Sequence, residues 1–278
     1  MRGGASSQRD KLSPGSCGGR FLESSFGSRV LIANIAAYKF VTIDDTDGLR
    51  TSLRELCLRL HLKGTILLAP EGINLFLAGS SDATSEFLAN LPLDKRFEGI
   101  EAKWSWSDFV PFKRLRVKLK AEIVTLRLDG LDPVRVPAPL LSAAELKNWF
   151  DEGRDFVLLD TRNEWEITEG TFENALNPHL RSFGEFPQSV DALADLRDKT
   201  IVTFCTGGIR CEKAAPLLLM RGFRQVYQLQ GGILKYFEEC GGAHWRGNCV
   251  VFDDRGALDS QLRPAAENIK PDPTASTE

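Results

Sequence analysis

The sequence predicts an α/β protein built from two modules, and two observations carry this prediction. Residues 30–126 show strand-like and helix-like runs in the order strand, helix, two strands, helix, strand. Residues 140–240 show strands that alternate with helices, as a parallel sheet demands. A proline-containing stretch at residues 131–139 lies between them and is typical of a linker. The chain has 278 residues, more than a typical single domain, which agrees with two modules.

The first module is predicted element by element. Residues 30–40 form a strand by composition, and residues 64–69 and 73–78 form two strands joined by a turn. The helix after the first strand carries four leucines at helical spacing, namely Leu49, Leu53, Leu56 and Leu60. A second helix spans about residues 81–91, and one last strand ends near Leu126. This order is the split βαβ plan of a ferredoxin-like α+β domain.

The second module begins near Leu140, and both ends of the chain are expected to be disordered. Residues 1–28 are rich in glycine, serine and arginine and poor in hydrophobic residues. Their arginine excess also fits a transit peptide, although we favour a flexible extension. The predicted boundaries are an extension at 1–28, a ferredoxin-like domain at 29–128, a linker at 129–139, a parallel-sheet domain at 140–240, a C-terminal extension at 241–258 and a disordered tail at 259–278.

Composition limits the classes of function. The formal net charge is -3, which argues against a protein that is basic all over, so any contact with nucleic acid must come from a local patch. No stretch approaches the roughly 20 apolar residues of a membrane helix. Six cysteines are too sparse for a disulfide scaffold, and a reactive thiol needs a reducing compartment. We therefore expect a soluble, cytoplasmic protein. No pattern indicates its oligomeric state.

The most informative local feature is Cys205, which follows the apolar strand 200–204 and precedes a helix. The loop between them consists of Thr206, Gly207, Gly208, Ile209 and Arg210. Unpaired N–H groups and the helix dipole at a helix start favour a thiolate, so we expect a nucleophile or a persulfide carrier at Cys205 rather than a cysteine that merely packs. Cys211 is either a resolving thiol for Cys205 or a core residue.

The loop length resembles that of the rhodanese superfamily. Four residues separate Cys205 from Arg210, whereas a tyrosine phosphatase loop needs five, so the cradle suits sulfur better than phosphate. Further resemblance lies in residues 157–162, 170–178 and 229–233, and it covers most of residues 140–240. A rhodanese-like parallel-sheet fold is therefore expected there.

Asp160 and Arg162 end a parallel strand of this domain, where ligands collect in open α/β sheets. They are either groups that support the active site from behind or a structural ion pair, and we favour the structural role. Arg181, Phe183 and Phe186 follow on a loop and could approach the site from the side.

A basic strip is predicted on the last strand of the first module. From residue 114 onward cations alternate with apolar residues, and period two places them on opposite faces of a strand. The five cations of this strip, candidates for binding nucleic acid, are Lys113, Arg114, Arg116, Lys118 and Lys120. Four aromatic residues, Trp104, Trp106, Phe109 and Phe112, precede the strip and could stack on bases. On these residues alone, a merely solvated sheet face is slightly favoured over a binding surface.

Motifs along the whole chain resemble the oxygen-dependent tRNA uridine hydroxylases, in which a rhodanese domain follows an acylphosphatase-like domain. They lie at residues 38–40, 62–74, 118–126 and 245–255, together with the Cys205 loop. The resemblance implies hydroxylation of the wobble uridine of tRNA at C5 with molecular oxygen, an oxidoreductase reaction. It also implies that Cys205 is catalytic, that Arg210 shapes the loop, and that the basic strip holds the tRNA backbone.

We expect no metal and no cofactor. The three histidines show no iron-binding pattern, and no dinucleotide fingerprint is present. Cys240, His244 and Cys249 have an unusual spacing for zinc and lack a fourth ligand, so we expect them to be structural. The chain ends without the cysteine pairs that some longer relatives carry. Neither the tRNA set nor the electron source can be read from the residues.

Two other functions remain open at this point. A sulfurtransferase that carries a persulfide on Cys205 would account for the loop but not for the first module. A non-catalytic RNA-binding or regulatory module would not account for an intact Cys205.

Overall fold

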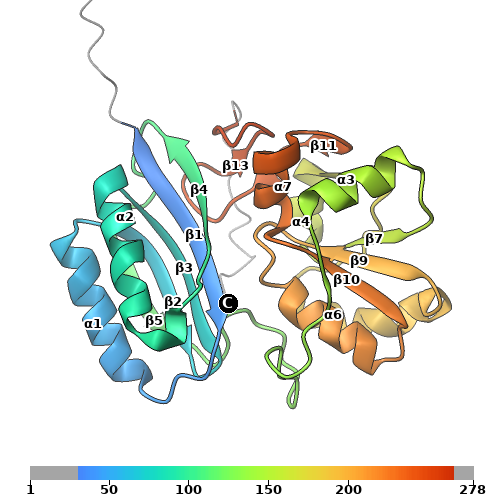
Figure 1. Ribbon diagram of the computed structural model, residues 1–278, viewed down its shortest axis with the longest axis horizontal. Helices are drawn as coiled ribbons and strands as arrows, with labels where there is room; N and C mark the ends of the chain where they lie inside the picture. The colour runs from blue at the N-terminus through green and yellow to red at the C-terminus, as the bar shows by residue number, and fades with distance from the viewer. Residues whose placement is uncertain (1–30, 266–278) are drawn as a thin grey trace, which may run out of the picture. The chain divides into compact units, whose positions relative to one another are not determined.

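The computed structural model describes residues 31–265 (Figure 1). The extension or transit peptide predicted at residues 1–28 lies outside the described residues, as does the predicted tail from residue 266 onward. No helix in the described part of the chain is both long enough and apolar enough to span a membrane.

A five-stranded sheet with the order β4-β1-β3-β2-β5 forms the N-terminal part. Its elements are β1 (Ile32–Phe40), α1 (Thr46–Arg59), β2 (Lys63–Ala69), β3 (Gly72–Gly79), α2 (Ser81–Asn90), β4 (Ala102–Ser107) and β5 (Leu115–Leu119), with two short 3-10 turns, Leu91–Leu93 and Lys95–Phe97, before β4. Helices α1 and α2 lie along one face of this sheet (Figure 1). Leu53 and Phe87, on these helices, are buried against Ile66 and Leu75 of the strands. Both helices are N-capped by a side chain. Asp45 and Ser80 accept hydrogen bonds from free N–H groups of the first turns of α1 and α2.

The predicted single last strand is wrong in detail. The structure has two strands there: β4 pairs antiparallel with β1 and completes the ferredoxin-like order, while β5 adds to the edge, parallel to β2. Strand β5 ends at Leu119 rather than near Leu126. The reason is local, since the Glu122 carboxylate accepts the backbone N–H groups of Leu126 and Arg127 and thereby replaces strand pairing.

A four-stranded parallel sheet with the order β6-β10-β9-β7 forms the second part and confirms the predicted α/β class. Its elements are β6 (Leu140–Leu141), α3 (Ala143–Asp151), β7 (Val157–Asp160), α4 (Glu164–Glu169), β8 (Gly170–Phe172), a 3-10 turn (Phe183–Glu185), α5 (Phe186–Ser189), a 3-10 helix (Val190–Leu196), β9 (Thr200–Phe204), α6 (Cys211–Met220), β10 (Gln225–Leu229) and α7 (Gly232–Cys240). Helices α3 and α7 lie on one face and α6 on the other (Figure 1). Because the strands are parallel, the ends of β7 and β9 open at the same edge, where ligands collect in such sheets.

The C-terminal residues fold back onto this second part. Strand β11 (Trp245–Gly247) pairs with β8, and β12 (Cys249–Val250) pairs with β13 (Ala257–Leu258). We expected disorder from residue 259, but residues 259–265 are tied down by local bonds. The Arg263 guanidinium pairs with Asp259 at 3.0 Å, and the Ala265 N–H donates to the Ala257 carbonyl at 2.9 Å.

Candidate active site

The predicted strand, cysteine loop and helix are present. Cys205 directly follows β9 and is 1% exposed, and α6 begins at Cys211. The Gly208 N–H donates to the Cys205 sulfur at 3.2 Å. Gly208 has a φ of 97°, in the left-handed region, and a Cβ there would stand 2.9 Å from the Tyr38 hydroxyl. A glycine is therefore needed for the loop to bend over the sulfur.

The start of α7 holds the loop from behind. The N–H groups of Ile233 and Leu234 donate to the carbonyls of Cys205 and Thr206, both at 3.0 Å. Gly232, with a φ of 66°, brings α7 this close, since a Cβ at this position would stand 2.4 Å from the Cys205 carbonyl oxygen. The residues after β10 thus fix the backbone of the cysteine loop.

Cys205 is activated as a thiolate. Burial alone would raise the pKa of its thiol, but the neighbouring Cys211 thiol, the Arg210 charge and the N–H groups of Arg210 and Gly208 lower this pKa to about 6. Burial and the negative sulfur of Cys205 raise the pKa of Cys211 well above the usual range. At neutral pH the pair therefore holds one thiolate, at Cys205, and one thiol, at Cys211.

Arg210 is fixed by a carboxylate that the sequence analysis did not identify. Its guanidinium makes a bidentate pair with Glu166 of α4, at 2.7 and 2.9 Å, and both side chains are buried. Burial alone would lower the pKa of Arg210, but the Glu166 charge outweighs this effect and raises it. The available signal was the capping-box pattern at residues 163–166, which starts α4 with the same glutamate.

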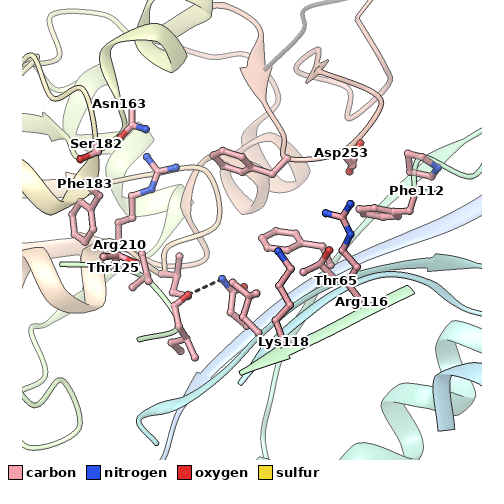
Figure 2. A pocket seen from close by; sticks show the side chains of 18 of the residues that line it. Thr65, Phe112, Arg116, Lys118, Thr125, Asn163, Ser182, Phe183, Arg210 and Asp253 are labelled. Carbon is pink, nitrogen blue, oxygen red and sulfur yellow. Dashed lines mark hydrogen bonds between the residues drawn. The ribbon is translucent and has the colours of Figure 1, made fainter. Parts of the chain in front are cut away.

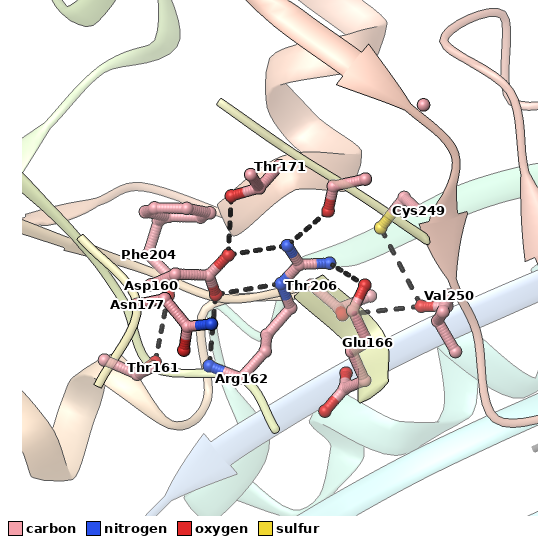
Figure 3. Close-up of polar contacts among 12 residues, drawn as sticks. Asp160, Thr161, Arg162, Glu166, Thr171, Asn177, Phe204, Thr206, Cys249 and Val250 are labelled. Carbon is pink, nitrogen blue, oxygen red and sulfur yellow. Dashed lines mark hydrogen bonds and ion pairs between the residues drawn. The ribbon is translucent and has the colours of Figure 1, made fainter. Parts of the chain in front are cut away.

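Asp160 and Arg162 form a closed, fully buried pair (Figure 3). The Arg162 guanidinium donates to both carboxylate oxygens of Asp160, at 2.9 and 2.6 Å, and to the Gly170 carbonyl at 2.7 Å. The Thr171 hydroxyl donates to the same carboxylate at 2.8 Å. Since these groups are occupied by one another, the geometry fits the structural role that we favoured.

The cations of β5 line a groove of about 440 Å³ (Figure 2). Lys113, Arg114, Arg116 and Lys118 are among its lining residues, whereas Lys120 is not. On the opposite face, Leu115, Val117 and Leu119 pack against the core of the N-terminal sheet. The alternation predicted from the sequence is therefore confirmed. The role of these cations in binding stays a prediction.

The aromatic residues before the strip divide between the core and the surface. Trp104 packs against the core and stacks on Trp106 at 6.1 Å, while Trp106 and Phe109 are exposed. Phe112 lines the groove.

Of the three residues expected to approach from the side, one lines the groove. Phe183 is among its lining residues. Phe186 is fully buried in the core, and Arg181 is exposed and pairs with Glu185 at 2.9 Å.

A smaller cavity of about 50 Å³ is lined by Cys205 and its neighbours Thr206 and Gly207. Tyr38 and Lys103 reach it from the N-terminal sheet, and Phe252 reaches it from the C-terminal residues. Five residues line both this cavity and the basic groove, namely Asn74, Phe76, Ile209, Arg210 and Phe252. The thiolate pocket therefore adjoins the groove. Sequence reasoning assigned no role to Tyr38, Lys103 or Phe252. Tyr38 and Phe252 lie within the family motifs at residues 38–40 and 245–255, which was the available signal for these two; no signal pointed to Lys103.

A buried lysine of α6 bonds to the segments that follow β2 and β5 of the N-terminal part. Lys213 Nζ lies 2.9 Å from Glu71 and 2.5 Å from Glu122, and it donates to the Val124 carbonyl at 2.9 Å. Lys213 is 3% exposed. The helix that follows the cysteine loop is thus held against the residues that flank the groove.

Within residues 31–265, no group of three or more histidine, cysteine or acidic side chains is arranged to hold a metal ion. His244 bonds Asp151 at 2.8 Å and stacks on Phe150, and Cys249 is buried with its pKa raised to about 12 by burial. Cys240, His244 and Cys249 do not form one site.

Two family models match the chain: the UPF0176 acylphosphatase-like domain at residues 32–123 and the rhodanese-like domain at residues 142–239. A curated tRNA uridine(34) hydroxylase of Cupriavidus taiwanensis is 54% identical, over 84% of this chain and 85% of the relative. Those of Variovorax paradoxus and Thiobacillus denitrificans are 54% and 51% identical, over 92% and 98% of their own lengths and 84% and 86% of this chain. The chain belongs to the tRNA uridine(34) hydroxylase family.

Membership of this family confirms the resemblance seen in the sequence motifs. It also confirms the order of the two predicted parts, an acylphosphatase-like domain before a rhodanese-like domain. A solved rhodanese-like domain from Anabaena is 23% identical over 39% of this chain and 79% of its own, with a TM-score of 0.34, and this likeness carries no further conclusion.

Proposed function

We propose that this chain is a hydroxylase of tRNA that introduces a hydroxyl group at C5 of the wobble uridine, with molecular oxygen as co-substrate and Cys205 as the catalytic residue. The observation that carries the proposal is a basic groove that shares five lining residues with the pocket over the Cys205 thiolate. The names of the curated relatives agree with this reaction.

The groove supplies the charge that an RNA backbone needs. Arg114, Arg116 and Lys118 have no carboxylate partner within the described residues, so their charges are available to phosphates. Contacts of this kind fix position without reading sequence. We propose residues 29–128 as the tRNA-binding part of the protein and the cytoplasm as its compartment.

The pocket over Cys205 accounts for the reactive step. The target base lies in the anticodon loop, where it is unpaired or easily turned out, so little energy is lost when it leaves its stack. Phe76 and Phe252 line both the groove and the pocket, and their rings offer surfaces for a base that moves between them. Cys205, held as a thiolate at the floor, would meet the base there.

The experiment is an isotope-labelling assay with the purified full chain, unmodified tRNA, a thiol reductant and ¹⁸O₂. Nucleoside mass spectrometry should show 5-hydroxyuridine at the wobble position that carries one ¹⁸O atom. A product that carries only ¹⁶O, and whose oxygen therefore comes from water, would contradict oxygen dependence. No modified uridine, together with turnover of a Cys205 persulfide, would favour the sulfurtransferase alternative, which does not account for the groove.

A further inference from the structure

Two cations line the Cys205 pocket, and they differ in how they are neutralised. The Arg210 guanidinium is paired with Glu166 at 2.7 Å. The Lys103 ammonium, on β4, has no hydrogen-bond acceptor and no carboxylate partner among residues 31–265. It lies over the face of the Tyr38 ring, with Nζ 4.5 Å from the ring centroid. Lys103 is thus an uncompensated cation beside the thiolate.

The aromatic neighbour of Lys103 is itself anchored. Tyr38 is fixed by its hydroxyl, which donates to the Glu212 carboxylate of α6 at 3.2 Å. Lys103 also lies near Gly231, since a Cβ built at Gly231 would stand 3.7 Å from Lys103 Cε. Burial lowers the pKa of Lys103, while the Cys205 charge opposes this effect. An uncompensated cation in a desolvated position costs stability, and such groups are concentrated at functional sites.

We propose that Lys103 is a catalytic residue of this site: its ammonium binds the C4 carbonyl oxygen of the uracil ring while the Cys205 thiolate adds to C6. The inference rests on the proposed function. It also gives the N-terminal sheet a part in the chemistry as well as in the binding of tRNA.

The step balances without any oxidant. A bond forms between the Cys205 sulfur and C6, and the C5–C6 π pair moves toward C4, so the negative charge passes from sulfur to the C4 oxygen as an enolate. Lys103 stabilises that charge in a pocket of low dielectric, where a fixed cation is worth far more than in water. C5 becomes electron-rich, which is the position at which oxygen is to be introduced.

The same step predicts a reaction in the absence of oxygen. The enolate takes a proton from the solvent at C5, loses a proton from C5 again, and expels the thiolate to restore uracil. Nothing is oxidised or reduced, but the hydrogen at C5 exchanges with the solvent. Measurement of this exchange therefore detects the addition of the Cys205 sulfur to C6 even when no hydroxylation takes place.

The test incubates the full chain with tRNA in D₂O without oxygen and follows deuterium at C5 of the wobble uridine by nucleoside mass spectrometry. The intact chain should exchange this hydrogen, and Cys205→Ser should not. Lys103→Met should slow the exchange and aerobic hydroxylation by roughly 10²-fold, and Lys103→Arg should retain part of both. Lys147→Met is the matched control, because Lys147 lies on α3, lines neither the pocket nor the groove, and is already paired with Asp151; it should leave both rates unchanged.

The melting temperature of Lys103→Met distinguishes a catalytic role of Lys103 from a structural role. Because Lys103→Met removes a half-buried charge that has no carboxylate partner, its melting temperature should equal or exceed that of the intact chain, whereas loss of a structural residue would lower it. Normal exchange in Lys103→Met would overturn the inference. Aerobic hydroxylation by the intact chain without any anaerobic exchange would overturn it while the proposed function stands. An intact chain that neither exchanges nor hydroxylates would overturn both.

Discussion

The basic groove and the thiolate pocket adjoin each other but use charge in opposite ways. In the groove, Arg114 and Arg116 are exposed and lack carboxylate partners within the described residues. In the pocket, Arg210 is buried and committed to Glu166, and the Cys205 thiolate is held by N–H groups. Exposed, unpaired cations suit a long polyanion bound by charge, whereas buried, fixed groups suit one reacting atom. We therefore expect damage to the groove to affect KM and damage to the pocket to affect kcat.

The largest difference between the effect on kcat and the effect on tRNA affinity should come from Cys205→Ser. Because a hydroxyl at this position stays protonated at neutral pH, the purified variant should lose roughly 10³-fold or more in kcat. Its affinity for tRNA, measured by filter binding, should stay within about twofold of that of the intact chain, since no phosphate contact is lost. Equal losses of affinity and rate would break the division between groove and pocket.

Lys213, which joins α6 to the N-terminal part, should matter for stability. Lys213→Met leaves Glu71 and Glu122 without their cation, and we expect a loss of about 3 kcal/mol in the free energy of unfolding. Urea denaturation measures it. The control is Lys199→Met, which breaks an exposed pair with Asp155 and should cost no more than about 1 kcal/mol. Similar small losses in both variants would show that the contacts of Lys213 do not hold α6 against the N-terminal part.

The pH dependence of alkylation should distinguish Cys205 from the other buried thiols. With a pKa of about 6, Cys205 is a thiolate above that pH, and its rate with iodoacetamide should fall about tenfold per pH unit below it. Cys57 and Cys249, whose pKa values burial raises to about 12, should not react in the folded protein. Peptide mapping assigns the labelled sites. A midpoint near the free-cysteine value of about 8.5 would contradict the described activation.

The smallest effect is expected in the groove. Arg116→Ala should weaken tRNA binding several-fold and reduce the slope of log affinity against log salt concentration by about 1, because one phosphate contact is lost. Arg50→Ala on α1 is the control, since Arg50 is already paired with Asp47. An unchanged salt slope in Arg116→Ala would exclude this strand from the tRNA interface.

The sequence was sufficient to predict those parts of the site whose residues lie close together in the chain. Cys205 and its loop lie within one short segment, and the alternation of β5 requires only period two. No role at the site could be assigned to Glu166 or Lys103, because each acts on a residue that is distant in the sequence. Glu166, for example, pairs with Arg210, 44 residues further along the chain. The extra strand was missed for a related reason. Where β4 ends and β5 begins depends on the pairing partners, which only the folded sheet supplies.

The most direct test of the central claim is mass spectrometry of tRNA nucleosides from cells that lack this protein, complemented with the intact chain or with Cys205→Ser. We predict that the intact chain alone restores 5-hydroxyuridine derivatives at the wobble position, and only when the cells grow with oxygen. Modification that persists without the protein, or that Cys205→Ser restores fully, would contradict the account.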